Sequence, residues 1–247
     1  MNICVLSNDL RYKELGRILS QGGYNLVEGT KEGLQNCDAL VLSVANEYNE
    51  EELVKIRDLL NPYCVVFSGN AKKVSQLLLR EVIDYSKDLA FLQKNAELTA
   101  EACLSLIYGE TKRSLRGERV LVSGYGQIGK ELCRILDFLG AELFVYARRA
   151  EIRSKVESLG YKSVDLNKLP PIDIVLNTVP HIIFTKAITD SIPNTVLFEL
   201  ASKPGGYEDL NRVVDGGRLP GRILYKTAAK IIYNTLTAYF PCEKGHI

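Results

Sequence analysis

A glycine pattern between a strand-like run and a helical run constrains the fold of this chain more than any other feature. The segment "RVLVSGYGQIGKELCRILDFLG" (residues 119–140) contains Gly124-x-Gly126-x-x-Gly129. Between a strand and a helix, this pattern predicts a turn that cradles the pyrophosphate of a dinucleotide. The first glycine makes the tight turn, the second lets the phosphates approach the backbone, and the third lets helix and strand pack closely. The alternative is a strand-to-helix turn in which the glycines are incidental.

The acidic residue that usually holds the adenine ribose is missing. In NAD-binding proteins an Asp or Glu about 20 residues after the first glycine binds the ribose 2′-hydroxyl. Here that place falls near Ala147, which Arg148 and Arg149 follow. A small side chain leaves room for a 2′-phosphate, and guanidinium groups bind phosphate oxygens in pairs, so the sequence favours NADP. Otherwise the two arginines are solvated charges at a strand end.

Polar residues also follow the next two predicted strands of this region, in "LNTVP" (176–180) and "LASKPGG" (200–206). Ligands of doubly wound sheets bind at the carboxyl ends of the strands, so we expect these residues beside the cofactor or the substrate. Ordinary strand-end turns are the alternative. The residues expected to contact the cofactor are Gly124, Tyr125, Gly126, Gln127, Ile128, Gly129, Ala147, Arg148, Arg149, Asn177, Thr178, Val179, Pro180, Ala201, Ser202 and Lys203.

Short β-rich runs alternate with helix-length segments along the whole chain, which predicts α/β architecture with parallel sheets. We expect two α/β units. The first, residues 1–95, is a smaller flavodoxin- or Rossmann-like layer that carries substrate and catalytic residues, with a C-terminal helix (226–247) packing back on it. The second, residues 96–225, is a doubly wound parallel Rossmann sheet that is preceded by a linker helix over residues 98–107.

The composition limits the partners of the protein. The 247 residues carry a net charge of +1 without a dense Lys/Arg run, so we expect neither nucleic acid nor a membrane surface as partner. No apolar run approaches the ~20 residues of a membrane span, and the N-terminus lacks the features of a signal peptide. Six scattered cysteines and two histidines offer no metal-ligand spacing. We therefore expect no metal and a reducing cytoplasm.

The ordered motifs of the chain resemble the dipicolinate synthase A family, which makes pyridine-2,6-dicarboxylate for bacterial spores. The motifs that carry the resemblance are "RGERVLVSGYGQIG", "YARR", "NTVP", "LASKPGG" and "LPGRILYKTA", and "SNDLRY" and "NAELTAEA" also match. The resemblance covers most of the chain and is strongest over residues 115–236. There are departures: the segment at 45–62 is short for the family, and Leu98, Ala102 and Lys203 stand where Pro, Gly and Arg are usual.

The resemblance implies a bacterial, sporulation-type oxidoreductase that converts dihydrodipicolinate to dipicolinate by hydride transfer to NADP in an interdomain cleft. It also implies a homo-oligomer that works with a flavoprotein-like second subunit. Such a reaction needs anchors for two carboxylates and a proton acceptor. Lys203, Arg222, Lys226 and Arg11 are the candidate anchors.

Glu101, with Thr99 beside it, matches the family's linker motif and is the candidate base. The alternative for Glu101 is an ordinary exposed helix carboxylate. His181 follows "NTVP" and is expected to be a loop residue without a catalytic role, because the family does not require a histidine there.

Two other functions remain open. A D-2-hydroxyacid dehydrogenase or an adenosylhomocysteinase-like protein shares the expected two-domain order. The former needs a catalytic histidine near the last strands, and none lies between Phe184 and Glu243. The second alternative is a non-catalytic sensor or scaffold that binds NADP without turnover.

Overall fold

The computed structural model of the chain describes residues 1–44 and 48–240, which pack into two compact units. Unit 1 combines the segment Met1–Asn95 with the chain from Pro220 onward, and unit 2 is Ala96–Leu219. The end of the predicted C-terminal helical segment, with Cys242 and His246, lies outside the described residues.

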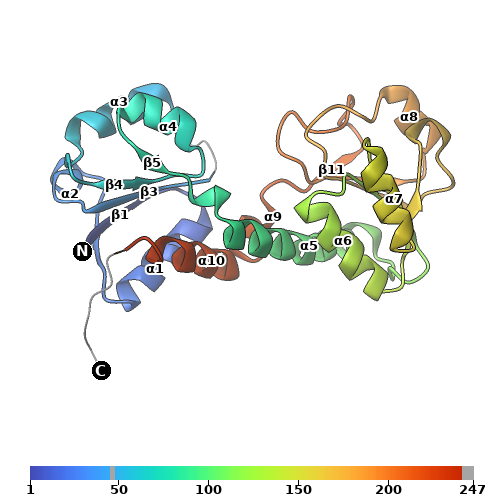
Figure 1. Cartoon of the computed structure of the whole chain (residues 1–247), viewed down its shortest axis with the longest axis horizontal. Coiled ribbons are helices and arrows are strands. Elements are labelled where there is room, and N and C mark those ends of the chain that lie inside the picture. Colours follow the sequence, from blue (N-terminus) through green and yellow to red (C-terminus); the bar gives the residue numbers. More distant parts are fainter. Residues whose placement is uncertain (45–47, 241–247) are drawn as a thin grey trace. The chain divides into compact units, whose positions relative to one another are not determined.

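Unit 1 is built on a parallel sheet, of which Figure 1 labels β1, β3, β4 and β5. The sheet has five strands in the order β2-β1-β3-β4-β5. This is the flavodoxin-like strand order, so the predicted fold class of the first unit is confirmed. The strands are β1 (Asn2–Leu6), β2 (Asn25–Val27), β3 (Ala39–Leu42), β4 (Val65–Phe67) and β5 (Val82–Ile83). The helices are α1 (Leu10–Gln21), α2 (Lys31–Gln35), α3 (Glu50–Leu59), α4 (Ala71–Leu78), η1 (Tyr85–Lys87), the beginning of α5 (Leu89–Thr111) and α10 (Tyr225–Thr237).

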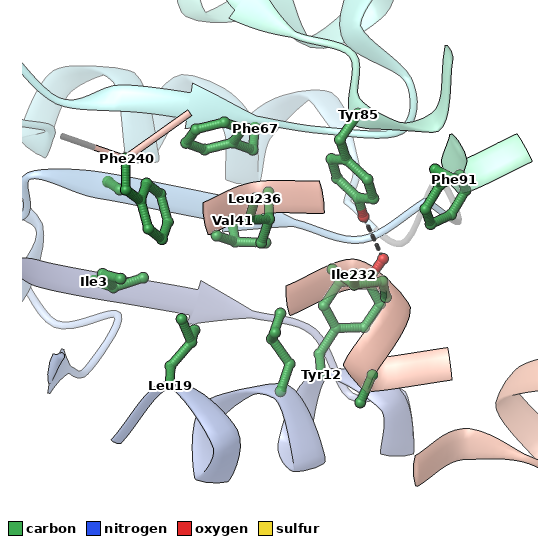
Figure 2. Packing of buried hydrophobic residues seen from close by; sticks show 13 residues of the cluster. Ile3, Tyr12, Leu19, Val41, Phe67, Tyr85, Phe91, Ile232, Leu236 and Phe240 are labelled. Carbon is green, nitrogen blue, oxygen red and sulfur yellow. Dashed lines mark hydrogen bonds between the residues drawn. The ribbon is translucent and has the colours of Figure 1, made fainter. Parts of the chain in front are cut away.

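Alternating side chains of the unit 1 strands point into two different cores, because successive residues of a strand face opposite sides of the sheet. Ile3, Val41 and Phe67 pack with α1 and α10 in one core (Figure 2). Cys4 and Leu40, one position away, belong to the core beneath α2, α3 and α4. The sheet is therefore covered on both faces, as a parallel sheet requires.

Two buried tyrosines fasten α1 to the carboxyl end of β3. The Tyr85 hydroxyl donates to the Leu42 carbonyl oxygen over 3.1 Å, and the Tyr12 hydroxyl accepts the Val44 N–H over 2.7 Å. The two hydroxyls also bind each other (Figure 2). Burial raises the pKa of Tyr12 to about 12, so this phenol stays protonated near neutral pH.

Unit 2 is a six-stranded parallel sheet of order β11-β10-β9-β6-β7-β8. This is the Rossmann order, which confirms the predicted doubly wound sheet. The strands are β6 (Arg119–Ser123), β7 (Glu142–Tyr146), β8 (Lys162–Ser163), β9 (Ile174–Asn177), β10 (Val196–Glu199) and β11 (Val213–Asp215). The remaining elements are α6 (Gln127–Phe138), α7 (Ala150–Ser158), η2 (Leu166–Lys168), α8 (Lys186–Ser191) and α9 (Leu219–Arg222), which begins at the last residue of unit 2.

The expected elements differ from the observed ones in three respects. The apolar run "YCVVFSG" (63–69) forms only a short strand: Tyr63 is 91% exposed, and β4 covers Val65–Phe67. The linker helix is longer than the predicted 98–107, since α5 runs over Leu89–Thr111. Four strands of two or three residues, β2, β5, β8 and β11, were not predicted.

A charged pair joins β6 to β9 at their amino ends. Arg119 donates from Nε and Nη2 to the Asp173 carboxylate over 2.9 and 2.8 Å, and its backbone N–H donates to the same carboxylate over 2.9 Å. These hydrogen bonds lower the pKa of Asp173 from 3.8 to about 2. Because the folded-state pKa lies below the ordinary value, the pair stabilises the fold above about pH 4 and loses this effect as the pH falls toward 2.

We expect Asp173→Asn to lower the free energy of unfolding by ~1 kcal/mol at pH 7, a figure that allows for the partial exposure of the pair. The difference from the unsubstituted protein should shrink as the pH falls below about 4. Urea unfolding at several pH values measures both effects. Asp190→Asn, in the exposed pair with Lys186, is the control with little expected effect. A loss for Asp173→Asn that stays constant from pH 7 to pH 3 would contradict this account.

Candidate functional site

The glycine pattern forms the turn between β6 and α6. Gly124 has φ +88°, a left-handed conformation that favours glycine, and its N–H donates to the Tyr146 carbonyl oxygen over 2.9 Å. Gly126 is the N-cap residue of α6, where no side-chain hydrogen bond caps the helix. The N–H groups of the first helical turn have no intrahelical partners, so this helix end is suited to an anion.

The three glycines of this turn differ in the space around them. A Cβ on Gly129 would lie 2.1 Å from the Gly124 carbonyl oxygen, and one on Gly124 would lie 2.7 Å from Thr178 Oγ1. A Cβ on Gly126 would meet no protein atom within 4 Å. Gly124 and Gly129 are thus required by packing, whereas the space at Gly126 suits a ligand that approaches the backbone. The turn fits the pyrophosphate of a dinucleotide.

Tyr125, between the first two glycines, is half-buried. Burial raises the pKa of its phenol to about 12. The hydroxyl therefore stays uncharged near neutral pH and does not repel a phosphate. Gln127, which begins α6, is exposed, and Ile128 is half-buried.

A pocket of about 430 Å³ opens at the carboxyl end of β7. Ala147, which is 8% exposed, stands at the position of the missing acid and lines the pocket together with Arg148. Arg149 is the N-cap residue of α7 and is not among the lining residues. We call this cavity the β7 pocket; its lining residues are Tyr146, Ala147, Arg148, Arg153, Glu157, Ser163, Val164 and Asp165.

Arg153 also lines the pocket, although it was not among the predicted site residues. Its Nη1 donates to the carbonyl oxygens of Ala147 and Arg148 over 3.2 and 2.7 Å, which holds the guanidinium against the end of β7. The signal was present, since Arg153 lies four residues after Arg149 and four residues make about one helical turn. The pocket also contains two carboxylates, Glu157 and Asp165, so its charge is mixed.

Asn177 ends β9 with all the hydrogen-bonding capacity of its side chain in use. Its Oδ1 accepts from the Ser123 hydroxyl (2.6 Å) and the Val179 N–H (3.1 Å). Its Nδ2 donates to the Val179 carbonyl oxygen (3.0 Å) and to Glu199 Oε1 (2.7 Å). A side-chain amide has two donors and two acceptor positions, so no polar group of Asn177 is left for the predicted cofactor contact. Its role is to hold the strand ends together.

The other residues of "NTVP" lie around the glycine turn. The Thr178 hydroxyl donates to the Ser123 carbonyl oxygen over 2.7 Å. A Cβ on Gly124 would meet Val179 Cγ2 at 2.9 Å, so these two predicted cofactor residues back the pyrophosphate turn. Pro180 and His181 are exposed.

Loop 201–206 follows β10 and carries Ala201, Ser202 and Lys203. Ser202 and Lys203 are exposed, whereas Ala201 is half-buried. Glu199, the last residue of β10, accepts from the N–H groups of Ala201 and Gly206 over 2.8 and 2.6 Å. Glu199 was not among the predicted site residues, although a carboxylate inside the apolar run "VLFELA" is an unusual feature of the sequence.

Glu101 and Thr99 lie on the part of α5 that belongs to unit 2, where Glu101 is exposed and Thr99 is buried. Lys203 belongs to unit 2 as well. Arg11, Arg222 and Lys226 belong to unit 1. The predicted catalytic residues therefore come from both units.

Arg11 is held by an ion pair within unit 1. Its Nε and Nη2 donate to the two carboxylate oxygens of Asp9 over 3.0 and 2.7 Å, and its side chain is only 6% exposed. A Cβ on Gly221 would lie 2.6 Å from Arg11 Nε, so the glycine of "LPGR" lets α9 pack on this pair. Asp9 also caps α1 by accepting the Arg11 N–H.

Lys226 and Arg222 are exposed. Lys226 lies in the first turn of α10. A hydrogen bond from Arg17 and the nearby charges of Arg17 and Lys226 lower the pKa of the Glu14 carboxyl on α1. Lys226 is thus close to an acidic group of its own unit.

Within residues 1–44 and 48–240, no group of three His, Cys, Asp or Glu side chains is arranged to hold a metal ion. Over the same residues, no helix is both long and apolar enough to span a bilayer. The cysteines of this part of the chain, Cys4, Cys37, Cys64, Cys103 and Cys133, are buried free thiols.

Comparison with known proteins finds relatives among NAD-binding dehydrogenases and dipicolinate synthases. Residues 92–197 match the model of the NAD-binding domain of D-isomer specific 2-hydroxyacid dehydrogenases. The dipicolinate synthase A protein of Bacillus subtilis (strain 168), a subunit of that enzyme, is 26% identical over an alignment of 298 positions. The alignment covers 99% of this chain and 98% of the relative. The crystal structure of the dipicolinate synthase A protein from Bacillus halodurans superposes with a TM-score of 0.81 at 22% identity and covers 96% of this chain and 97% of that one. The D-lactate dehydrogenase of Salmonella gives a TM-score of 0.61 at 16% identity over 100% of this chain and 98% of that one.

The fold and the site define the class: unit 2 is a dinucleotide-binding Rossmann unit of the dehydrogenase type, which supports a nicotinamide cofactor and an oxidoreductase. Within this class, the resemblance to dipicolinate synthase A is confirmed, since the similarity extends over nearly the whole length of both chains.

The glycine turn gives a prediction that separates binding from folding. Gly126→Ala should leave the melting temperature of the ligand-free protein within about 2 °C, because the added Cβ meets no protein atom. The same methyl group occupies the space of the phosphates, so we expect nicotinamide dinucleotide to bind at least ~10-fold more weakly. Thermal unfolding and calorimetric titration measure the two effects.

Gly129→Ala is the matched control. Its Cβ would collide with the Gly124 carbonyl oxygen, so this variant should lower the melting temperature markedly before any ligand is added. If Gly126→Ala bound the dinucleotide as well as the unsubstituted protein, the assignment of the glycine turn as the pyrophosphate site would be wrong.

Proposed function

We propose that the protein is an NADP-dependent oxidoreductase of the dipicolinate synthase A type, which oxidises dihydrodipicolinate to dipicolinate. The whole-length similarity to dipicolinate synthase A supports the substrate. The β7 pocket supports the cofactor, and it is the observation on which the proposal mainly rests. There, Ala147 replaces the usual acid and two arginines line the cavity.

The preference for NADP follows from charge and space in the β7 pocket. A carboxylate at position 147 would bind the ribose 2′-hydroxyl and repel a 2′-phosphate. The Ala147 methyl group does neither, and Arg148 and Arg153 bring positive charge to the cavity. Glu157 and Asp165 bring negative charge to the same cavity, and Asp165 Oδ1 accepts from the Asn167 N–H over 3.0 Å and from Asn167 Nδ2 over 3.1 Å.

We expect Arg148→Ala to weaken the binding of NADP about 10- to 100-fold, the range for one charged hydrogen bond, and that of NAD less than about 3-fold. Arg149→Ala should have a smaller effect, because Arg149 is not among the residues that line the pocket. Titration of each variant with both dinucleotides measures the two affinities.

Two further variants test the role of charge. Arg134→Ala removes an exposed cation of α6 that pairs with Glu131, and it should leave both affinities unchanged. Glu157→Gln removes a negative charge from the pocket and should strengthen NADP relative to NAD. Equal weakening of both dinucleotides by Arg148→Ala would sink the assignment of NADP.

The proposed reaction removes a hydride and a proton from the dihydropyridine ring and leaves an aromatic pyridine. Bound NADP supplies the hydride acceptor. The residues of this chain bind the two carboxylates of the substrate, orient the ring carbon and accept the proton. Lys203 of unit 2 and Arg222 and Lys226 of unit 1 are the proposed anchors, and Glu101 is the proposed base. These residues come from both units.

The proposal places Arg11 in a supporting position. Its carboxylate partner Asp9 occupies both Nε and Nη2, so the guanidinium is largely neutralised before a substrate binds. We also propose a cytoplasmic homo-oligomer that works with a flavoprotein-like second subunit, since the similar protein from Bacillus subtilis is one subunit of its enzyme.

Turnover tests the function directly. The protein is supplied with freshly generated dihydrodipicolinate and NADP, with and without a candidate second subunit. We expect dipicolinate and NADPH to form in equal amounts. Chromatography and absorbance measure the two products. Tight binding of NADP without product in either condition would favour a non-catalytic NADP-binding sensor or scaffold.

Glu101→Gln assigns the base within the same assay. General-base catalysis contributes roughly 10²- to 10⁴-fold, so we expect kcat to fall by at least ~100-fold while the affinity for NADP is unchanged. Glu110→Gln, an exposed carboxylate near the end of the same helix, is the control that should keep full activity. A kcat for Glu101→Gln close to that of the control would leave Glu101 as an ordinary surface carboxylate.

A further inference from the structure

The buried carboxylate of Glu199 is the centre of a hydrogen-bond network at the carboxyl edge of unit 2. Glu199 is 9% exposed and accepts three hydrogen bonds. Two come from backbone N–H groups of loop 201–206, those of Ala201 (2.8 Å) and Gly206 (2.6 Å). The third comes from Asn177 Nδ2 over 2.7 Å, at the end of the neighbouring strand β9.

The network has one consistent arrangement of donors and acceptors. Ser123, which ends β6, donates its hydroxyl to Asn177 Oδ1 over 2.6 Å. This bond and the Val179 N–H turn the oxygen of the Asn177 amide away from Glu199, so its nitrogen faces the carboxylate. Since all three partners of Glu199 are donors, the side chain acts only as an acceptor, which is the hydrogen-bonding pattern of an ionised carboxylate.

The loop is fitted closely around this network. A Cβ on Gly206 would lie 2.2 Å from Asn177 Nδ2, and one on Gly205 would lie 2.8 Å from Glu199 Oε2. Gly205 also has φ +84°. The two glycines of "KPGG" therefore let the loop backbone come close enough to bind the carboxylate. The first and the last residue of the loop both donate to Glu199.

We propose that Glu199 is a positioning residue that holds loop 201–206, and with it Ala201, Ser202 and Lys203, in the conformation that contacts the nicotinamide half of the cofactor. This inference rests on the proposed function: with the adenosine half of NADP at the glycine turn and the β7 pocket, the nicotinamide half lies over the other half of the doubly wound sheet, which contains β9 and β10. Glu199 itself reaches no ligand, because its carboxylate is buried and its hydrogen bonds go to the protein. It acts through the two backbone N–H groups and through Asn177.

The consequence is selective. The adenosine half of the cofactor meets the glycine turn and the β7 pocket, whose residues make no hydrogen bond to Glu199 among those the structure describes. Disturbing Glu199 should therefore weaken contacts of the nicotinamide half and spare those of the adenosine half. A general loss of stability would weaken both alike.

The experiment compares two ligands on Glu199→Gln. The amide keeps the shape of the side chain, but its NH₂ group takes the place of one carboxylate oxygen and faces N–H donors. At least one buried N–H is then left without an acceptor. We expect the affinity for NADP to fall at least ~10-fold. The affinity for 2′-phospho-ADP-ribose, which lacks the nicotinamide, should change less than about 2-fold. Glu208→Gln, an exposed acceptor of a single backbone N–H, is the matched control that leaves both affinities unchanged.

Hydrogen exchange supplies a readout that needs no ligand. In Glu199→Gln the amides of Ala201 and Gly206 should exchange faster, while those of β6 and α6 keep their protection. If this variant does not fold, Glu199→Asp takes its place, since its shorter side chain keeps the charge but cannot reach all three donors.

The outcomes separate the inference from the proposed function. Loss of NADP with 2′-phospho-ADP-ribose retained, together with faster exchange in the loop, supports the positioning role. Equal loss of both ligands, or unchanged affinity for both, overturns it. If the unsubstituted protein binds 2′-phospho-ADP-ribose but gains nothing from the nicotinamide, the inference is likewise overturned. Binding of neither ligand by the unsubstituted protein contradicts the proposed cofactor itself.

Discussion

The burial of the Glu199 carboxylate determines how the chain is arranged at the carboxyl ends of the unit 2 strands. Removing the charge of Glu199 from water is costly unless hydrogen bonds replace the lost hydration, so the surrounding chain must supply donors. They come from the amide of Asn177 and from two N–H groups of loop 201–206. The amide can face the carboxylate because the Ser123 hydroxyl and the Val179 N–H fix its oxygen. The end of β9, the end of β10 and the loop after β10 are thus held by the hydrogen bonds of this one carboxylate.

In each unit, polar groups gather at the carboxyl edge of that unit's own sheet, because both sheets are parallel. In a parallel sheet all strands end on one side, and the loops that follow them gather there. In unit 1, the Asp9–Arg11 pair follows β1, and the two bonded tyrosines meet the chain at the end of β3. These groups satisfy one another, and Gly221 lets α9 close over the ion pair. In unit 2 the corresponding edge leaves the N-terminus of α6 without a side-chain cap and the β7 pocket open. Parallel strands therefore gather polar groups at one edge in both units, and in unit 2 that edge also holds the glycine turn and the β7 pocket.

Features encoded by neighbouring residues could be predicted from the sequence, whereas features that join distant residues could not. The strand–glycine–helix pattern at 119–140 and the buried strands β1, β3, β6, β7, β9 and β10 depend on local spacing and apolar runs. The short edge strands β2, β5, β8 and β11 lack such runs, because they become strands only by pairing with a neighbour. The role of Asn177 was not predictable, since its partners Ser123 and Glu199 are 54 and 22 residues away. Arg153 was predictable in principle from helical spacing alone.

The β7 pocket illustrates why counting charges in a sequence motif is a weak guide to cofactor preference. Specificity is a difference between two affinities, so a group matters only if it treats the 2′-phosphate and the 2′-hydroxyl differently. Arg149 adds positive charge to the motif but is not among the lining residues, and part of the hydrogen-bonding capacity of Arg153 is taken up by the carbonyl oxygens of Ala147 and Arg148. Glu157 and Asp165, which lie outside the motif, return negative charge to the cavity. The proposed preference for NADP therefore rests on two residues. Ala147 has no carboxylate to bind the ribose 2′-hydroxyl of NAD or to repel the 2′-phosphate of NADP. The guanidinium of Arg148 attracts that 2′-phosphate, which NAD does not have.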